Sequence, residues 1–194
     1  MTVKEEVTMS LKQLLEQSDV TLQQIQDHLG ALSDEARVQQ ATDLKGKQLS
    51  ILWRLSDKTE AIALDEVVPE GHAPLAPIPF EGQNSLPLFR RFQKVFYRTP
   101  DGRIAGYNNS PVGWLVGPGY YILKKDDTGI YVDYTDLPNE KPSEWPPIKR
   151  NDAGITTLVY GNMKDYLRRV YGKVFIGKAY KKGKETENYF TLAR

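Results

Sequence analysis

VGWLVGPGYY, residues 112–121, consists of apolar runs on either side of a glycine-proline-glycine turn. The runs Val112–Val116 and Tyr120–Leu123 have the composition of short strands. The turn between them, Gly117–Gly119, suits residues that have no side chain or a fixed φ. The pattern predicts the central hairpin of a β domain.

Further strand-like runs lie on both sides of this hairpin. Pro100–Gly102 and Lys125–Gly129 have the composition of turns, so we expect a meander of antiparallel strands around them. The strands predicted after residue 88 number eight: 89–98, 103–107, 112–116, 120–123, 130–134, 155–160, 174–180 and 188–192.

One helix is predicted within this β domain, over residues 162–171. Asn162 is a good N-cap, Asp165 suits the first turn and Gly172 follows the last. The apolar residues recur at helical spacing: Met163, Tyr166, Leu167 and Val170.

The N-terminal part has the pattern of several short helices. Ser10-Leu-Lys-Gln13 and Thr21-Leu-Gln-Gln24 are capping boxes, and Ser33 is followed by two acids. The pattern predicts helices over 11–17, from 22 to an end at Gly30, from Ser33 onward, and over 47–57. Helices this short are marginal alone, so we expect them to pack on one another or on the rest of the chain.

A proline-rich segment separates the two parts. Residues 67–88 contain five prolines and no sustained period, which predicts an extended connector. The expected organisation is a helical segment 1–66, a connector 67–88 and an antiparallel β domain 89–194. The predicted fold class is α+β, with the helical segment packed on a β-barrel or strongly curved sheet.

Charge and composition exclude several classes of function. The net charge is +1, so no overall field favours nucleic acid or membrane, and neither is expected as a partner. Residues 1–44 carry a net −5 and residues 151–194 a net +5, so the two ends can attract each other. The chain has no cysteine, no apolar segment of membrane-spanning length and two glutamates near its start, so we expect a soluble, cytoplasmic protein.

Catalytic and metal motifs give little support to an enzyme. The common nucleophile, phosphate-loop and zinc-protease motifs are missing from the sequence, and the histidines, His28 and His72, are far apart. We therefore predict no metal and no cofactor. The weak catalytic candidates are Asp133, an acid inside a predicted strand, and its neighbour Tyr134.

The aromatic content of the β domain suggests an apolar binding site instead. An eight-stranded closed sheet can hold one small ligand, and tyrosine and tryptophan add polar groups to an apolar wall. The predicted ligand-binding residues are Tyr107, Asn109, Trp114, Tyr120, Tyr121 and Tyr160.

Three functions remain as hypotheses. The first is a module that binds a small apolar or aromatic molecule inside the sheet. The second is a protein-interaction or structural module that acts through the acidic N-terminal helices. The third is a metal-free enzyme that uses an Asp/Tyr constellation.

Overall fold

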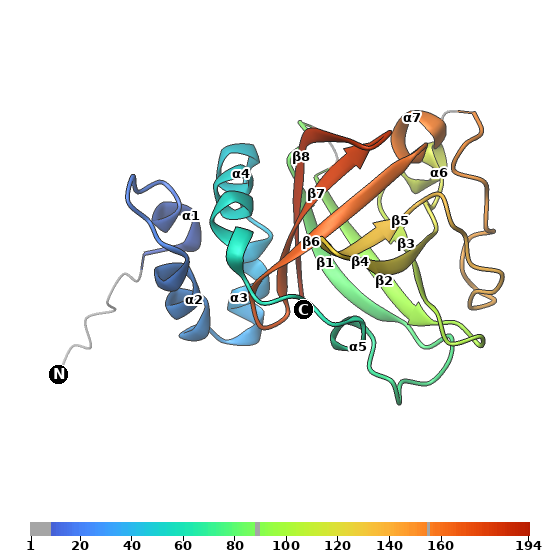
Figure 1. Cartoon of the computed structure of the whole chain (residues 1–194), viewed down its shortest axis with the longest axis horizontal. Helices are drawn as coiled ribbons and strands as arrows, with labels where there is room; N and C mark the ends of the chain where they lie inside the picture. Colours follow the sequence, from blue (N-terminus) through green and yellow to red (C-terminus); the bar gives the residue numbers. More distant parts are fainter. Residues whose placement is uncertain (1–8, 88–89, 155) are drawn as a thin grey trace.

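Eight antiparallel strands form a closed barrel in the computed structural model, which describes residues 9–87, 90–154 and 156–194 (Figure 1). Consecutive strands are neighbours, and β1 pairs with β8 from Glu81 opposite Ala193 to Asn84 opposite Phe190. The predicted α+β fold with an antiparallel barrel is confirmed. The strands are β1 Ile78–Asn84, β2 Arg91–Arg98, β3 Ile104–Asn109, β4 Tyr121–Asp126, β5 Gly129–Asp133, β6 Met163–Tyr171, β7 Val174–Lys181 and β8 Lys184–Ala193.

The N-terminal helices form a layer on the outside of β6, β7 and β8 (Figure 1). They are α1 Leu11–Leu14, α2 Leu22–Gly30, α3 Asp34–Ala41 and α4 Gly46–Leu55, followed by the short 3-10 helix η1, Ser56–Lys58. The predicted helix starts are confirmed, because the side chains of Ser10, Thr21 and Ser33 each accept a hydrogen bond from the first turn. The first helix ends sooner than predicted, at Leu14.

The contact between this layer and the barrel is mainly apolar. Leu29 and Leu49 belong to the same buried cluster as Ile176 and Tyr189 of the barrel. The Thr191 hydroxyl also donates to the Ala41 carbonyl oxygen at 2.7 Å. Helices and barrel therefore share a core, and the apolar faces of the helices are covered by the chain's own strands.

Short helices lie at both ends of the barrel. In a meander, alternate connections between strands fall at opposite ends of the barrel. Helix α6 (Gly113–Val116) connects β3 to β4 and α7 (Thr156–Tyr160) connects β5 to β6, so both lie at one end. Helix α5 (Leu64–Val67), which precedes β1, lies at the other end (Figure 1). Val116 and Val159 pack against the interior core from the first end. We call α6 and α7 together the cover.

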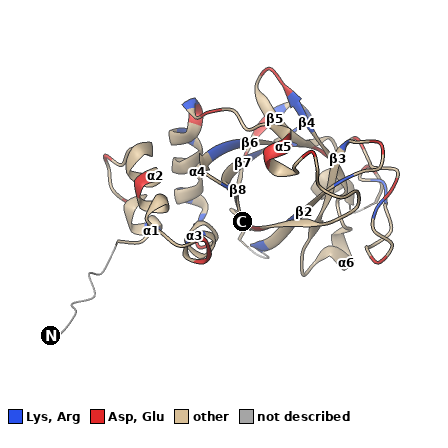
Figure 2. Cartoon of the chain, turned by 90° about the horizontal axis from the view of Figure 1, so that it is seen from below, with Lys and Arg blue, Asp and Glu red and all other residues tan. Residues whose placement is uncertain are grey.

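Ion pairs and hydrogen bonds hold α5 in place. Arg169 of β6 donates to both carboxylate oxygens of Glu66, at 2.7 and 2.8 Å, and Arg98 donates to the Val68 carbonyl oxygen at 2.7 Å. Figure 2 shows this acidic α5 beside the basic residues of β6. The α5 end is thus closed by charge-assisted contacts above a buried apolar layer that includes Val67.

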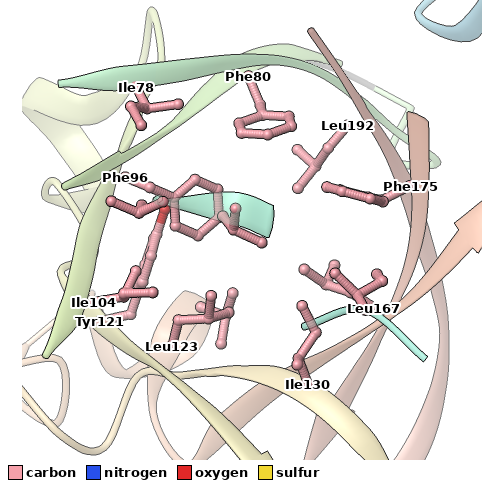
Figure 3. Close-up of a cluster of buried hydrophobic side chains, with 14 of the residues drawn as sticks. Ile78, Phe80, Phe96, Ile104, Tyr121, Leu123, Ile130, Leu167, Phe175 and Leu192 are labelled. Atoms are coloured by element: carbon pink, nitrogen blue, oxygen red, sulfur yellow. The ribbon is translucent and has the colours of Figure 1, made fainter. Parts of the chain in front are cut away.

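Side chains fill the barrel interior (Figure 3). A series of aromatic rings crosses it, each ring centroid within 5.6 Å of the next: Phe175, Phe80, Phe96, Tyr121, Tyr134 and Tyr160. Glycine is required where a ring lies against the backbone. A Cβ on Gly177 would come within 2.1 Å of the Phe190 ring.

The predicted helix over residues 162–171 is wrong, because residues 163–171 form β6. Along this strand Asp165 and Leu167 are buried on the side that faces the interior, and Val170 is buried against the helical layer. A buried carboxylate at an inward position hides the period of two that marks a strand. Asn162 has φ +52° and lies in the turn before β6.

Two predicted strands are single helical turns instead. Residues 113–116 form α6 and residues 156–160 form α7. Both runs are too short for their period to separate strand from helix. Gly117 and Gly119 do turn the chain, with φ of +82° and +56°. Phe89 and Ile155, the first residues of two predicted strands, lie outside the described residues.

The proline-rich segment 67–88 contains a second strand that was not predicted, β1. Ile78 and Phe80 point inward and alternate with exposed residues. Pro79 is tolerated because β1 pairs with β8 only from Glu81 onward, so the proline lies where β1 still has a free edge. The described barrel has eight strands, but seven of them, β2 to β8, follow residue 88, where eight were predicted.

Candidate functional site in the barrel interior

A buried group of polar side chains lies inside the barrel. Each of the five side chains comes from a different strand or from the end of one. In the order of the strands β2 to β6, they are Lys94, Asn108, Tyr121, Tyr134 and Asp165. We call these five residues the Lys94 cluster. Tyr121 and Tyr134 were predicted as site residues from the sequence, whereas Lys94 and Asp165 were not.

The register of the strands brings these side chains together. Lys94 lies directly opposite Asn108 on the neighbouring strand. Asp165 lies opposite Val132, and Tyr134 is two residues further on and so shares the inward side of the sheet. Lys94 is 1% exposed and Asp165 is 4% exposed.

Lys94 and Asp165 form a buried ion pair, with 3.1 Å between Nζ and Oδ2. Lys94 also donates to the Asn108 side-chain oxygen at 3.0 Å and to the Tyr134 hydroxyl at 2.5 Å. The Tyr134 hydroxyl accepts a further hydrogen bond from Asn108 at 2.9 Å and donates to Asp165 at 3.1 Å. The ammonium group therefore uses all three of its N–H bonds.

Tyr121 differs from its neighbours in this cluster. Its side chain is fully buried, its ring centroid is 5.5 Å from that of Tyr134, and its hydroxyl has no hydrogen-bond partner among the described residues. A buried hydroxyl without a partner costs stability. This donor is therefore free to bind a group that enters the barrel.

Burial also changes how the cluster ionises. Desolvation lowers the pKa of Lys94, and the Asp165 carboxylate opposes that shift. Desolvation, with the Asp165 charge second, holds the pKa values of Tyr121 and Tyr134 well above the usual range. Burial raises the pKa of the neighbouring Tyr160 to about 12. Both hydroxyls of the cluster are therefore hydrogen-bond donors at neutral pH.

A surface cleft lies beside one member of the cluster, Tyr134. It has a volume of about 270 Å³ and shares Tyr134 with the Lys94 cluster. The other lining residues are Thr135, Leu137, Arg150, Asn151, Asp152 and Asn162. Two further clefts lie on the outer surface. One is lined by separate residues between Thr128 and Gly183, and the other by separate residues between Asp34 and Arg91.

The predicted ligand-binding residues fall in different places. Tyr121 and Tyr160 lie in the interior core, and Tyr160 stacks on Tyr134 with 5.0 Å between ring centroids. Tyr107 and Tyr120 point outward and stack on each other under the loop that carries Trp145.

The remaining two predicted residues are at the surface. Trp114 of α6 is 84% exposed. Asn109 donates to the Gln93 side-chain oxygen at 2.9 Å in an exposed contact. The structure therefore brings only Tyr121 and Tyr160 of the six into the interior.

The weak catalytic candidate Asp133 is buried but lies outside the barrel wall. It precedes the inward-facing Tyr134, so its side chain points to the opposite side of the sheet. It pairs with Lys124 at 3.0 Å and accepts from the Thr135 hydroxyl at 2.6 Å. Burial would raise the pKa of Asp133, but its hydrogen bonds with Thr135 and Lys124 lower it overall. Within the Lys94 cluster, the acid that accepts a hydrogen bond from a tyrosine hydroxyl is Asp165.

The two histidines make separate local contacts. His28 lies 2.8 Å from the Gln40 side-chain oxygen, and His72 lies 3.1 Å from the Ala76 carbonyl oxygen. Within residues 9–87, 90–154 and 156–194, no group of three His, Cys, Asp or Glu side chains is placed to hold a metal ion. The described helices include none that is both long enough and apolar enough to cross a membrane.

The fold and the site define a closed antiparallel barrel with a helical outer layer and one buried polar cluster. Comparisons with models of protein families, with curated proteins and with solved structures gave no match. The Lys94 cluster is therefore the feature of the molecule that bears on its function.

Proposed function

We propose that the protein binds a small apolar or aromatic molecule that carries one neutral polar group, inside the end of the barrel that α6 and α7 cover. The observation that carries this proposal is the Tyr121 hydroxyl, a buried donor with no partner among the described residues, in contact with an aromatic core. A carbonyl or hydroxyl oxygen of the ligand would accept its hydrogen bond.

The charge of the site favours a neutral ligand. Lys94 and Asp165 already compensate each other, so an ionised ligand would add an unpaired charge to a buried site. The aromatic side chains around the pair give an apolar or aromatic molecule favourable contacts. The ligand class is therefore mostly apolar, with a single oxygen that accepts a hydrogen bond.

The cover supplies the room that such a ligand needs. The interior is filled by side chains, so the ligand replaces those that the cover inserts, which include Val116, Val159 and Tyr160. The two cover helices have four and five residues, and helices this short have little stability of their own. The cleft of about 270 Å³ beside Tyr134 is close to the lower size of ligand pockets, and in this proposal it is where the ligand enters.

Glycine amide resonances test both binding and its location. We would titrate ¹⁵N-labelled protein with acetophenone, which carries a carbonyl oxygen, and with ethylbenzene, which does not. Gly106 and Gly177 lie against Tyr121 and Phe190 inside the barrel, whereas a Cβ on Gly102 or Gly183 would meet no neighbour. We expect saturable shifts at the first pair and none at the second.

The carbonyl group should determine the affinity. One neutral hydrogen bond is worth about 1 kcal/mol, so acetophenone should bind about fivefold tighter than ethylbenzene. Tyr121→Phe should remove this difference, whereas Tyr107→Phe, on the outer face, should keep it. Shifts confined to the exposed glycines, or no saturable shift with either compound, would contradict the proposal.

A further inference from the structure

The Lys94 amine has surroundings unlike those of an ordinary buried cation. Besides its three hydrogen-bond partners, its Nζ lies between aromatic rings, at 4.9 to 5.9 Å from four ring centroids. The rings are those of Phe92, Tyr121, Tyr134 and Phe190. A primary amine, a carboxylate and a hydroxyl without a partner among the described residues thus lie together in the apolar interior, next to Tyr160 of the cover.

We propose that Lys94 holds its ligand covalently, as an imine formed with the carbonyl carbon of an apolar or aromatic aldehyde. The proposal rests on the proposed function, because it takes the same ligand site and names the class of ligand. An aldehyde has the neutral oxygen that the Tyr121 hydroxyl can bind. Because Nζ lies 4.9 Å from the centroid of the Tyr121 ring, that hydrogen bond would bring the carbonyl carbon toward the amine.

The reaction needs no oxidant, reductant or metal. The Lys94 ammonium first gives a proton to the Asp165 carboxylate, 3.1 Å away. The amine lone pair then forms the C–N bond, and the electron pair of the C=O double bond moves to oxygen, where Tyr121 donates a hydrogen bond. The nitrogen loses one proton and the oxygen gains one, which gives a neutral carbinolamine.

Loss of water completes the reaction. The carbinolamine oxygen takes the proton that Asp165 holds, the C–O bond breaks, and the nitrogen lone pair forms the C=N bond. The sum is one ammonium group and one aldehyde converted into one protonated imine and one water. Asp165 is again a carboxylate and lies beside the positive charge, as it does beside the ammonium group.

Burial favours Lys94 over the other paired lysines. Desolvation lowers its pKa, which raises the fraction of reactive free amine. Lys178 is a matched contrast, since it is also buried but pairs with the exposed Glu185 on the outside of the barrel. Burial acts to lower the pKa of Lys178, but the hydrogen bond with Glu185 raises it overall.

Reductive trapping tests the imine directly. The full chain would be incubated at pH 7 with benzaldehyde and sodium cyanoborohydride, and peptide mapping by mass spectrometry would then locate each benzylated lysine. We expect Lys94 to be labelled faster than Lys178, because the lowered pKa of Lys94 leaves more reactive free amine, whereas the pKa of Lys178 is raised. Equal rates would overturn the proposal. Labelling at Lys94 should disappear in Lys94→Arg and remain in Lys178→Arg.

A parallel measurement without covalent chemistry separates this proposal from the one on which it rests. Benzyl alcohol cannot form an imine, and its binding is read from the Gly106 and Gly177 amides. If benzyl alcohol binds but the trapping experiment labels only exposed lysines, the imine proposal is overturned and the proposed ligand site stands. Failure of both would overturn both proposals. The wild-type peptide map gives this answer even if Lys94→Arg does not fold.

Discussion

Two tyrosines of the Lys94 cluster should respond in opposite directions to the same substitution. Tyr121 and Tyr134 are both buried in the interior, with 5.5 Å between their ring centroids. Tyr134 shares its hydroxyl among Lys94, Asn108 and Asp165, whereas the Tyr121 hydroxyl has no partner among the described residues. Replacing each by phenylalanine removes one oxygen atom and keeps the ring.

The expected magnitudes follow from these contacts. Tyr121→Phe removes a buried hydroxyl without a partner, which should raise the free energy of unfolding by about 1–3 kcal/mol. Tyr134→Phe removes hydrogen bonds to a charged pair, which should lower it by about 1.5–3 kcal/mol. The two variants should therefore differ by about 2.5–6 kcal/mol, the sum of these ranges.

Urea unfolding followed by circular dichroism measures both values, provided that the slope of the transition is unchanged. In a protein of 194 residues each kcal/mol corresponds to about 2–4 °C in Tm, so thermal unfolding gives an independent check. A loss of more than about 1 kcal/mol for Tyr121→Phe would mean that this hydroxyl has a partner in solution. The ligand site proposed around it would then lose its main support. A more stable Tyr121→Phe that no longer distinguishes acetophenone from ethylbenzene would show that the free hydroxyl is kept for binding.

Three further predictions concern charge. Lys94→Met should lower the free energy of unfolding by about 3–5 kcal/mol, because it leaves Asp165 buried without its cation. Lys178→Met, whose partner Glu185 is exposed, should lower it by less than about 1 kcal/mol. Equal decreases of the two variants in urea unfolding would argue against the buried pair. The pKa of Lys94 is lowered on folding, so the unfolded chain binds its proton more strongly than the folded chain does. The free energy of unfolding of the wild type relative to Lys94→Met should therefore rise with pH from the folded pKa up to about 10, near the unfolded pKa of lysine. A flat difference between pH 7 and 10 in thermal unfolding would contradict this. Glu66→Gln should weaken the contact with Arg169 by about 1 kcal/mol, a value reduced for the partial exposure of Glu66. Hydrogen exchange should become faster over residues 62–68 and stay unchanged in β3. In the wild type, the Arg169 hydrogen bond lowers the pKa of Glu66, so the same contact should be lost as the pH falls below about 4.5.

The local signals in the sequence predicted the fold class because caps and turns depend on neighbouring residues. Ser10, Thr21 and Ser33 cap the predicted helices, and the turn at Pro100–Gly102 joins β2 to β3. The errors lie where tertiary contacts override the local pattern. Residues 163–171 form a strand because their partners β5 and β7 lie on both sides and because Asp165, on the inward side, has a buried cation to pair with.

The Lys94 cluster was only partly visible in the sequence. Phe92, Lys94 and Phe96 alternate along one predicted strand, so a charged residue between two aromatic residues on the same face is a signal that could have been used. Its partner Asp165 could not be found this way, because only the closed barrel brings β6 opposite β2. Tyr120 and Tyr121 are adjacent in a strand, and alternation requires that only one of them faces inward.

Closure of the barrel by β1 and β8 determines the order in which this chain can fold during synthesis. Helices α1 to α4 leave the ribosome before β6, β7 and β8, the strands that cover their apolar side chains. We therefore expect residues 11–55 to stay without a stable core until β8 has been synthesised. Removal of β8 should then prevent two events together, the pairing that closes the barrel and the docking of the helical layer.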